Sequence, residues 1–463
     1  MKNKQIIQIC SLCAVLLPGK LFAAEQPKTP NIIFILTDDQ RWDAMGYAGN
    51  TIIQTPEMDR LAREGVFFRN AFSSTPISAA SRASILTGVY ERTHGYTFGV
   101  GPLKEEFAET SYPVQLREQG YYTGFFGKFG VNYRNMKGLF DEADSYDRRD
   151  EFPDRRGYYY KTIDGDTVHL TQYAGYQARK FIENAPKDKP FCLSVSFSAP
   201  HAHDSAKEQY FWQEKSNDRY KDVVIPDPLL KEDHYFMDQP RGVQEGFNRV
   251  RWWWRYDTPE KYQHSVKGYY RMISEIDDEI GMIRNLLDEK DLSDNTVIIF
   301  LGDNGLFLGE RQMAGKWLMY EPSIHVPLIV YDPRGPRHQD VDDMVLNIDV
   351  PRTILDYANA DVPEKYQGRS LRAYADDKKD IKARESILIE HLWEKKEIPS
   401  SEGVRTKKWK YFRYRFLDVP EELYDLELDP METRNLAKEE SFKSVLVSMR
   451  VLCDQKIEEV KKK

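Results

Sequence analysis

Cysteine is scarce in this sequence, and long apolar runs are absent from most of it. Only four cysteines occur among 463 residues, and Cys10 and Cys13 lie close to the N-terminus. Of the other two, Cys192 lies in an apolar, strand-like segment and Cys453 lies near the C-terminus, so we expect no disulfide framework. After residue 24, no segment approaches the roughly 20 apolar residues that a membrane helix needs. We therefore expect no transmembrane segment.

The sequence also lacks an excess of positive charge, because its formal net charge is −8. An acidic chain is a poor general binder of nucleic acid, so we expect no nucleic acid partner. If the substrate is an anion, positive charge must be concentrated in the pocket that binds it. We see no internal repeat and no low-complexity linker. A chain of 463 residues is long enough for one large domain and a smaller one.

The N-terminus has the pattern of a secretory signal peptide. A basic start precedes an apolar segment from Ile6 to Leu17, and two small residues follow at positions 23 and 24. We therefore predict a leader over residues 1–24 and an exported protein of the bacterial periplasm. Loss of the three lysines of the leader would change the net charge from −8 to −11. Cys13 lies inside the apolar segment rather than after it, which disfavours a lipoprotein anchor.

Apolar runs that alternate with helical segments predict an α/β fold. Residues 31–36 form a nearly continuous apolar run, typical of a parallel strand buried on both faces. We expect further strands over 67–72, 121–126, 190–197, 295–301 and 326–330, and helices over 55–65, 113–120, 172–184 and 261–290. The alternation predicts a doubly wound, mostly parallel sheet with functional loops at the carboxyl ends of its strands. Residues 132–167 are predicted to form long loops.

The segment from Ser78 to Gly88 combines a helix start with a cation. It follows a strand-like run and ends at a glycine suited to ending a short helix, so Ser78 lies near a helix N-terminus. Unpaired N–H groups at such a position favour an anion. Arg82 lies one turn later and would stack over the serine, which suggests a site for phosphate or sulfate esters. A serine-rich cap without any ligand is the alternative.

Acidic and amide side chains follow two of the predicted strands. Asp38 and Asp39 come directly after one strand, and Asp303 and Asn304 come after another. Adjacent carboxylates repel each other unless a cation or hydrogen-bond donors compensate. These four residues offer only oxygen ligands, which suit Ca²⁺ or Mg²⁺, whereas zinc would recruit histidine or cysteine. A turn capped by an aspartate is the alternative.

These motifs resemble those of the type I, formylglycine-dependent sulfatases of the alkaline-phosphatase-like superfamily. Ser-x-Ala-x-Arg from Ser78, followed by Leu-Thr-Gly, resembles the formylglycine signature in its serine form. The resemblance implies that a serine-type formylglycine-generating enzyme oxidises Ser78, and that the hydrated aldehyde is the nucleophile. It also implies a divalent metal held by Asp38, Asp39, Ser78, Asp303 and Asn304.

The same resemblance suggests the catalytic residues. Arg82 would hold the nucleophile, and Lys128 and Lys316 match lysines that contact the sulfate. His201, in Ala-Pro-His, would be the protonated group that helps the leaving oxygen depart. The chain departs from the family pattern at Gly130, where a histidine is expected.

His203, which stands where the family usually has proline, is our candidate to replace that histidine. In an extended loop, residues 201 and 203 would project to the same side. The alternative is that Gly130 widens the pocket for a bulkier sugar, while His203 contacts substrate or solvent.

The insert over residues 204–258 carries several arginines and three consecutive tryptophans. Aromatic rings stack on sugar faces, and arginines bind sulfate or carboxylate. We predict Arg251, Trp253 and Arg255 as substrate-binding residues. Packing of this insert onto the domain is the alternative.

The resemblance covers nearly all of the chain after the leader and implies a sulfatase. The export signal and the insert rich in arginine and tryptophan favour a sulfated carbohydrate as its substrate. We expect a catalytic α/β domain over residues 25–380 and a small C-terminal subdomain, an antiparallel sheet with one helix, over 381–463. One alternative is a phosphatase or phosphodiesterase of the same fold with two zinc ions, which Asn304 disfavours because that chemistry commonly needs Asp-His there. The other is an inactive, sugar-binding relative.

Overall fold

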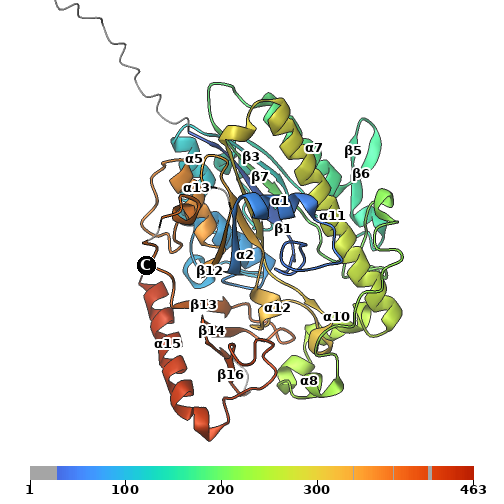
Figure 1. Ribbon diagram of the computed structural model, residues 1–463, viewed down its shortest axis with the longest axis vertical. Helices are drawn as coiled ribbons and strands as arrows, with labels where there is room; N and C mark the ends of the chain where they lie inside the picture. Colours follow the sequence, from blue (N-terminus) through green and yellow to red (C-terminus); the bar gives the residue numbers. More distant parts are fainter. Residues whose placement is uncertain (1–28, 337, 379, 416–419, 463) are drawn as a thin grey trace, which may run out of the picture.

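The computed structural model describes residues 29–462 apart from 337, 379 and 416–419, so the predicted leader lies outside the described residues. Its main sheet has eight strands (Figure 1), in the order β12 (Gln339–Leu346), β2 (Val66–Phe72), β11 (Leu328–Tyr331), β8 (Thr296–Gly302), β1 (Asn31–Thr37), β7 (Phe191–Ser196), β3 (Tyr122–Gly127) and β4 (Glu142–Ser145). Strand β11 is antiparallel to β8 and β2, whereas the other neighbours pair in parallel. The predicted doubly wound sheet is confirmed.

Helices cover both faces of the sheet because its central strands are apolar on both sides. In β1, Ile33 and Ile35 pack in one buried cluster, and the alternate residues Ile32 and Phe34 pack in another. The first cluster includes side chains of α1 (Pro56–Glu64), α7 (Leu170–Asn184) and α11 (Pro259–Glu289). The second includes side chains of α2 (Ser78–Thr87), α5 (Tyr112–Glu118) and α13 (Asp349–Tyr357) (Figure 1).

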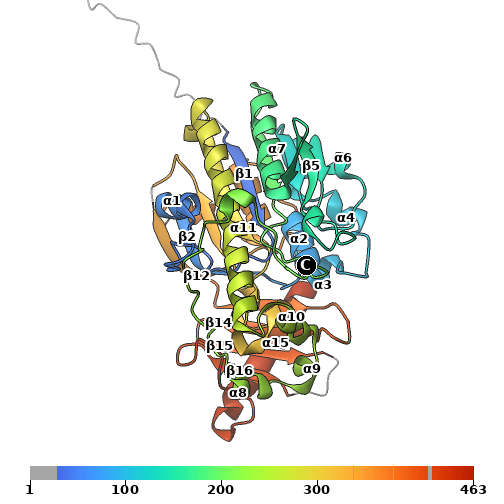
Figure 2. The same ribbon diagram turned by 90° about the vertical axis from the view of Figure 1, so that its right-hand side faces the viewer.

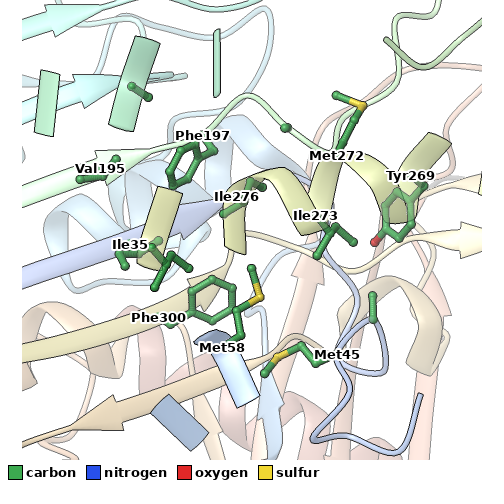
Figure 3. Packing of buried hydrophobic residues seen from close by; sticks show 14 of the residues in the cluster. Ile35, Met45, Met58, Val195, Phe197, Tyr269, Met272, Ile273, Ile276 and Phe300 are labelled. Carbon is green, nitrogen blue, oxygen red and sulfur yellow. The ribbon is translucent and has the colours of Figure 1, made fainter. Parts of the chain in front are cut away.

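Helix α11 is the longest described helix, and the sequence favours both its start and its length. Thr258 caps it by accepting a hydrogen bond from the Lys261 amide, and Pro259 occupies the first turn. Apolar residues spaced three or four apart put Ile273 and Ile276 against Phe300 of the sheet (Figure 3).

The C-terminal part forms a separate antiparallel sheet, as expected. Its strands are β13 (Ser386–His391), β14 (Ser401–Thr406), β15 (Trp409–Tyr414) and β16 (Glu422–Asp425), and α15 (Lys443–Lys461) packs against it (Figures 1 and 2). The domain boundary near residue 380 stays a prediction. Cys192 and Cys453 are buried and unbridged in the structure. Nowhere in the described chain does a helix combine the length and apolarity that crossing a membrane requires.

The prediction of loops over residues 132–167 is wrong in part. This segment contains α6 (Met136–Leu139), the edge strand β4 and a hairpin of β5 (Tyr159–Ile163) and β6 (Asp166–His169). Strand β4 carries no apolar run because most of its side chains are exposed. The remaining short elements are α3 (Glu91–His94), α4 (Glu105–Ala108), α8 (Asp233–Met237), α9 (Arg241–Gln244), α10 (Phe247–Arg255), α12 (Glu321–Ile324), α14 (Arg372–Ala375), β9 (Phe307–Leu308) and β10 (Ala314–Gly315).

A buried ion network joins the C-terminal sheet to the main domain. Lys410 of β15 lies 2.6 Å from Glu432 and 3.1 Å from Glu321 at the start of α12, and the Lys410 side chain is only 2% exposed. Arg405 of β14 also reaches Glu321, at 2.9 Å. Two acids from different parts of the chain thus share the Lys410 charge.

Replacing Lys410 by methionine should destabilise the protein strongly. Lys410→Met keeps the side-chain length but leaves Glu432 buried without its nearest cation, so we expect a loss of about 3–5 kcal/mol in the free energy of unfolding. Lys408→Met is the control, because Lys408 is 42% exposed and solvent screens its ion pairs, so this variant should lose little stability. Denaturant unfolding measures both variants, and equal losses would contradict the role of the buried network.

Candidate active site

The polar residues at the carboxyl ends of β1 and β8 meet the first residue of α2. Ser78 begins this helix, and its Oγ lies 3.0 Å from Asp38 Oδ1 and 3.1 Å from Asn304 Oδ1. Lys316 donates a hydrogen bond to the same Oγ at 2.6 Å. All four residues are buried. Helix α2 is buried on every side and ends at Gly88 in a left-handed conformation, which a glycine adopts without strain.

Asp39 and Asp303 are oriented by hydrogen bonds between the two strand ends. The Asp39 amide donates to Asp303 Oδ1 at 3.0 Å. The Asn304 amide group donates to Asp39 Oδ1 at 2.7 Å, which turns Asn304 Oδ1 towards Ser78. Asp39 has a φ of 65°, an uncommon value for a residue other than glycine. The predicted metal ligands therefore lie in one buried group.

Two lysines and an arginine balance this negative charge. Lys128 pairs with Asp38, and Lys316 pairs with Asp39. Arg82 donates through Nε to Asp303 Oδ2 at 2.9 Å, and through Nη1 to the Lys128 carbonyl at 2.7 Å. It also donates to Ser196 Oγ at the end of β7, at 2.6 Å, so its position is fixed by groups at three different strand ends.

The carboxyl groups respond differently to burial. Burial opposes ionisation of Asp38, but the charges of Lys128 and Lys316 hold its pKa well below the usual value. Burial and the nearby Asp38 charge instead raise the pKa of Asp303 to about 6. The repulsion that remains between Asp38 and Asp303 is what a bound cation would relieve.

The arrangement around Ser78 fits a divalent cation. Three oxygens, from Ser78, Asp38 and Asn304, converge within 3.1 Å, yet the serine hydroxyl has one hydrogen to share. Ligand atoms of Asp38, Asp39 and His201 also lie within 4.8 Å of one another. The donors are mainly oxygens, the ligands that Ca²⁺ and Mg²⁺ prefer.

His201 lies at this site but is not charged in the arrangement described. Its Nε2 lies 3.5 Å from Asp39, and its Nδ1 lies 2.5 Å from the Ala202 carbonyl, to which it donates. Burial and the neighbouring Arg148 charge lower the pKa of His201 well below its usual value. The imidazole is therefore neutral, whereas the family resemblance predicts a protonated donor.

The placement of His203 corrects its predicted role. Its side chain is fully buried, and Nε2 lies 2.7 Å from the Phe152 carbonyl and 3.2 Å from the Arg149 carbonyl. His203 thus holds the preceding loop in place and is not open to substrate. The expectation assumed an extended chain, but the backbone turns after His203.

The residues predicted from the insert separate into two environments. Arg251 and Arg255 both form ion pairs with Asp204, and Arg255 also donates to Gln209 at 2.7 Å. Against the cost of burial, these two arginines hold the pKa of Asp204 far below its usual value. Trp253 instead lies on the surface, with 49% of the residue exposed.

Sequence reasoning missed the pair Asp147 and Arg148. Asp147 lies 3.3 Å from both Lys128 and Arg148. The Nε of Arg148 is buried and has no hydrogen-bond partner among the described residues. Both residues closely follow the polar edge strand β4, in a segment without a recognisable motif. The only feature of the sequence that could have marked them is that an aspartate and an arginine are adjacent there.

Gly130 provides the space through which Arg82 passes. Its φ is +71°, and a Cβ built there would lie 2.6 Å from Arg82 Cδ. A side chain at this position would therefore both strain the backbone and displace Arg82. The departure from the family pattern at Gly130 is coupled to the path of Arg82.

Gly130→Ala should therefore cost more stability than a comparable glycine substitution elsewhere. Gly95 has a φ of +63° with nothing within 4 Å of its Cβ position, so Gly95→Ala measures the backbone cost alone, about 1–2 kcal/mol. Gly130→Ala should add about 1–3 kcal/mol for overpacking against Arg82. Denaturant unfolding compares the two, and equal losses would show that Arg82 moves aside without cost.

Two family models together match nearly all of the described chain. A model described as "Sulfatase" matches residues 30–360. A model described as "N-sulphoglucosamine sulphohydrolase, C-terminal" matches residues 309–463.

Curated relatives and solved structures are similar along most of their length. An N-acetylglucosamine-6-O-sulfatase of Bacteroides thetaiotaomicron is 28% identical, covering 89% of this chain and 83% of the relative. An arylsulfatase of Clostridium perfringens is 29% identical, covering 93% and 94%. A solved enzyme in complex with its substrate D-glucosamine-2-N,6-O-disulfate has a TM-score of 0.79 at 24% identity, covering 94% of this chain and 99% of that one. A phosphonate monoester hydrolase from Silicibacter pomeroyi has a TM-score of 0.77 at 22% identity, covering 94% and 95%.

Proposed function

We propose that this chain removes sulfate from a carbohydrate by means of formylglycine at position 78 and a calcium ion. The starting point is that it belongs to the sulfatase family and is therefore a sulfuric ester hydrolase. The observation that carries this proposal is the position of Ser78. It begins a buried helix, its Oγ lies next to Asp38 and Asn304, and Lys316 donates to it. An oxygen nucleophile, a cation site and a cationic side chain thus meet at one point.

Sulfatases generally use formylglycine and a divalent metal, and the residues present suit both. Asp38, Asp39, Asp303 and Asn304 would hold the metal together with position 78. The hydrated aldehyde of formylglycine supplies an oxygen nucleophile for attack on sulfur, and the cation supplies charge stabilisation.

The surrounding side chains position and neutralise the substrate. Lys316 already donates to the oxygen at position 78, so it is placed to hold the nucleophile and a sulfate oxygen. Lys128 offers a second positive charge beside Asp38, and Arg82 fixes Asp303. With Nδ1 protonated against the Ala202 carbonyl, His201 presents Nε2 as a site that accepts or relays a proton.

Two observations support a carbohydrate as the substrate. The similar relatives include enzymes named N-acetylglucosamine-6-O-sulfatase and ulvan-active sulfatase, the latter from Formosa agariphila. The predicted signal peptide suits an exported, periplasmic enzyme that meets glycans outside the cytoplasm. Its partner in maturation would be a serine-type formylglycine-generating enzyme.

A phosphatase with two metal ions fits the site less well. The described residues contain one group of His, Cys, Asp or Glu that fits a metal, around Asp38, Asp39 and His201. Asn304 turns its oxygen towards Ser78 and supplies no second-site imidazole. These features favour a single-cation site.

The purified enzyme should release sulfate from sulfated saccharides, and Ser78→Ala should abolish this activity. We expect a loss of at least about 10³-fold in kcat with the fold intact, because position 78 provides the reacting oxygen. Mass spectrometry of the peptide containing Ser78 should show a loss of about 2 Da on conversion to formylglycine.

Expression in a host without a serine-type maturation enzyme provides the control, since it should give folded but inactive protein. Activity in Ser78→Ala would contradict the proposed nucleophile. Release of phosphate rather than sulfate from matched esters would favour the phosphatase alternative, and cleavage of aryl sulfates alone would refute the carbohydrate substrate.

Calcium should stabilise the protein by binding to Asp38, Asp39 and Asp303. At a calcium concentration near 100 times its dissociation constant, the free energy of unfolding should rise by about 2.7 kcal/mol. Asp38→Asn should lose this increase together with calcium binding in titration calorimetry. Asp147→Asn should keep both, because Asp147 also pairs with Lys128 but is not among the predicted ligands. Equal calcium binding by both variants would contradict the assignment.

A further inference from the structure

A row of aromatic side chains begins beside the active site. Trp317 directly follows Lys316, and Ile77 directly precedes Ser78. The two side chains pack together with Ala80 and Ile398 in a small buried cluster. The row therefore starts at the chain neighbours of Lys316 and Ser78, whose polar groups are hydrogen-bonded to each other.

The row continues outward through α10 and the segment after β13. Phe247, at the start of α10, lies with its ring centre 6.0 Å from Trp317 and 5.3 Å from Trp254. Lys395 lies over the rings of both Phe247 and Trp393, at 5.7 and 5.3 Å. Helix α10 and the C-terminal sheet lie side by side here (Figures 1 and 2), and the Phe247 amide donates to the Glu397 carbonyl.

The outer end of the row is open to solvent. Trp393 lies 5.4 Å from Phe98, ring centre to ring centre. Exposure rises from 4% at Trp317 to 45% at Phe98, with Phe247 and Trp393 half-buried between them. Packing explains the buried end but not the large apolar ring of Phe98 left exposed at the other.

Two buried donors near the inner end lack partners. The indole Nε1 of Trp317 and the Nε of Arg251 have no hydrogen-bond acceptor among the described residues. The Arg251 guanidinium lies 4.2 Å from the centre of the Trp317 ring, so both donors belong to one region. Unpaired buried donors are costly, and hydroxyl or acidic oxygens of a ligand would satisfy them.

We propose that Phe98, Trp393 and Phe247 form a second subsite, which binds the sugar next to the one whose sulfate is cleaved, and that Trp254 and Trp317 support these rings from the inner end of the row. The inference rests on the proposed function and specifies its substrate as an oligosaccharide. Sugar rings present apolar faces that stack on aromatic side chains, and the two unpaired donors suit their oxygens. Lys395 at the row favours a sulfate or carboxylate on that second sugar.

The test compares a sulfated oligosaccharide with the corresponding sulfated monosaccharide. Trp393→Ala and Phe98→Ala should each lower kcat/KM for the oligosaccharide by about tenfold, mainly by raising KM. Neither variant should change kcat/KM for the monosaccharide more than about twofold. Trp409→Ala is the control, because it removes a half-buried tryptophan of β15 that packs on Phe442. It should leave kcat/KM unchanged for both substrates.

Equal losses on both substrates, or no loss on either, would overturn the subsite. Thermal unfolding checks that each variant is folded. If Trp393→Ala does not fold, Phe98→Ala still tests the subsite, because it removes only an exposed ring. If the wild-type enzyme cleaves neither saccharide, the proposed function fails. Titration calorimetry then still tests the subsite, because the oligosaccharide should bind the wild type at least about tenfold more tightly than Trp393→Ala.

Discussion

Three carboxylates held out of water against three cations are the constraint on which this structure depends. Asp38, Asp39 and Asp303 would repel one another in the core if the lysines and Arg82 did not face them. Such a group is tolerated only where the backbone fixes every member. The carboxyl edge of a parallel sheet meets this demand, because it brings residues from distant parts of the chain to rigid, adjacent strand ends.

Arg82 shows how the same contacts serve both folding and chemistry. Its guanidinium bonds to Asp303 after β8, to the Lys128 carbonyl after β3 and to Ser196 at the end of β7. It thereby ties three strand ends to helix α2, whose first residue is Ser78. Gly130 leaves room for this arginine. Ser78 is thus held in place by a cation that belongs as much to the core as to the site.

The sequence allowed prediction wherever a local pattern determined the structure. The apolar runs predicted the central strands, and the glycine at position 88 predicted the end of α2. Motifs at the strand ends identified Asp38, Asp303 and the residues beside them as one group. Strands and helix ends restrict where a side chain can point, so the resemblance to the sulfatase motifs could be carried onto these residues one by one.

Loops gave no such restriction, and the errors lie there. His203 was expected to project with His201, but a turn buries it among the carbonyls of residues 149–152. Trp253 is the exposed member of the three consecutive tryptophans, and its role in binding substrate stays a prediction. Asp147 and Arg148 follow an exposed edge strand, so neither hydropathy nor a motif marks them.

The aromatic row and the catalytic group are built from different kinds of structure. The charged residues belong to strand ends and a fully buried helix, whereas Phe98 and Trp393 belong to surface segments between elements. Surface segments accept insertions and exchanges at little cost to the core. In the proposed subsite, the residues that bind the glycan can therefore change without a change in those around Ser78. Substitutions or insertions in the segments around Phe98 and Trp393 would then change the substrate that is bound, while the charged residues around Ser78 stay the same.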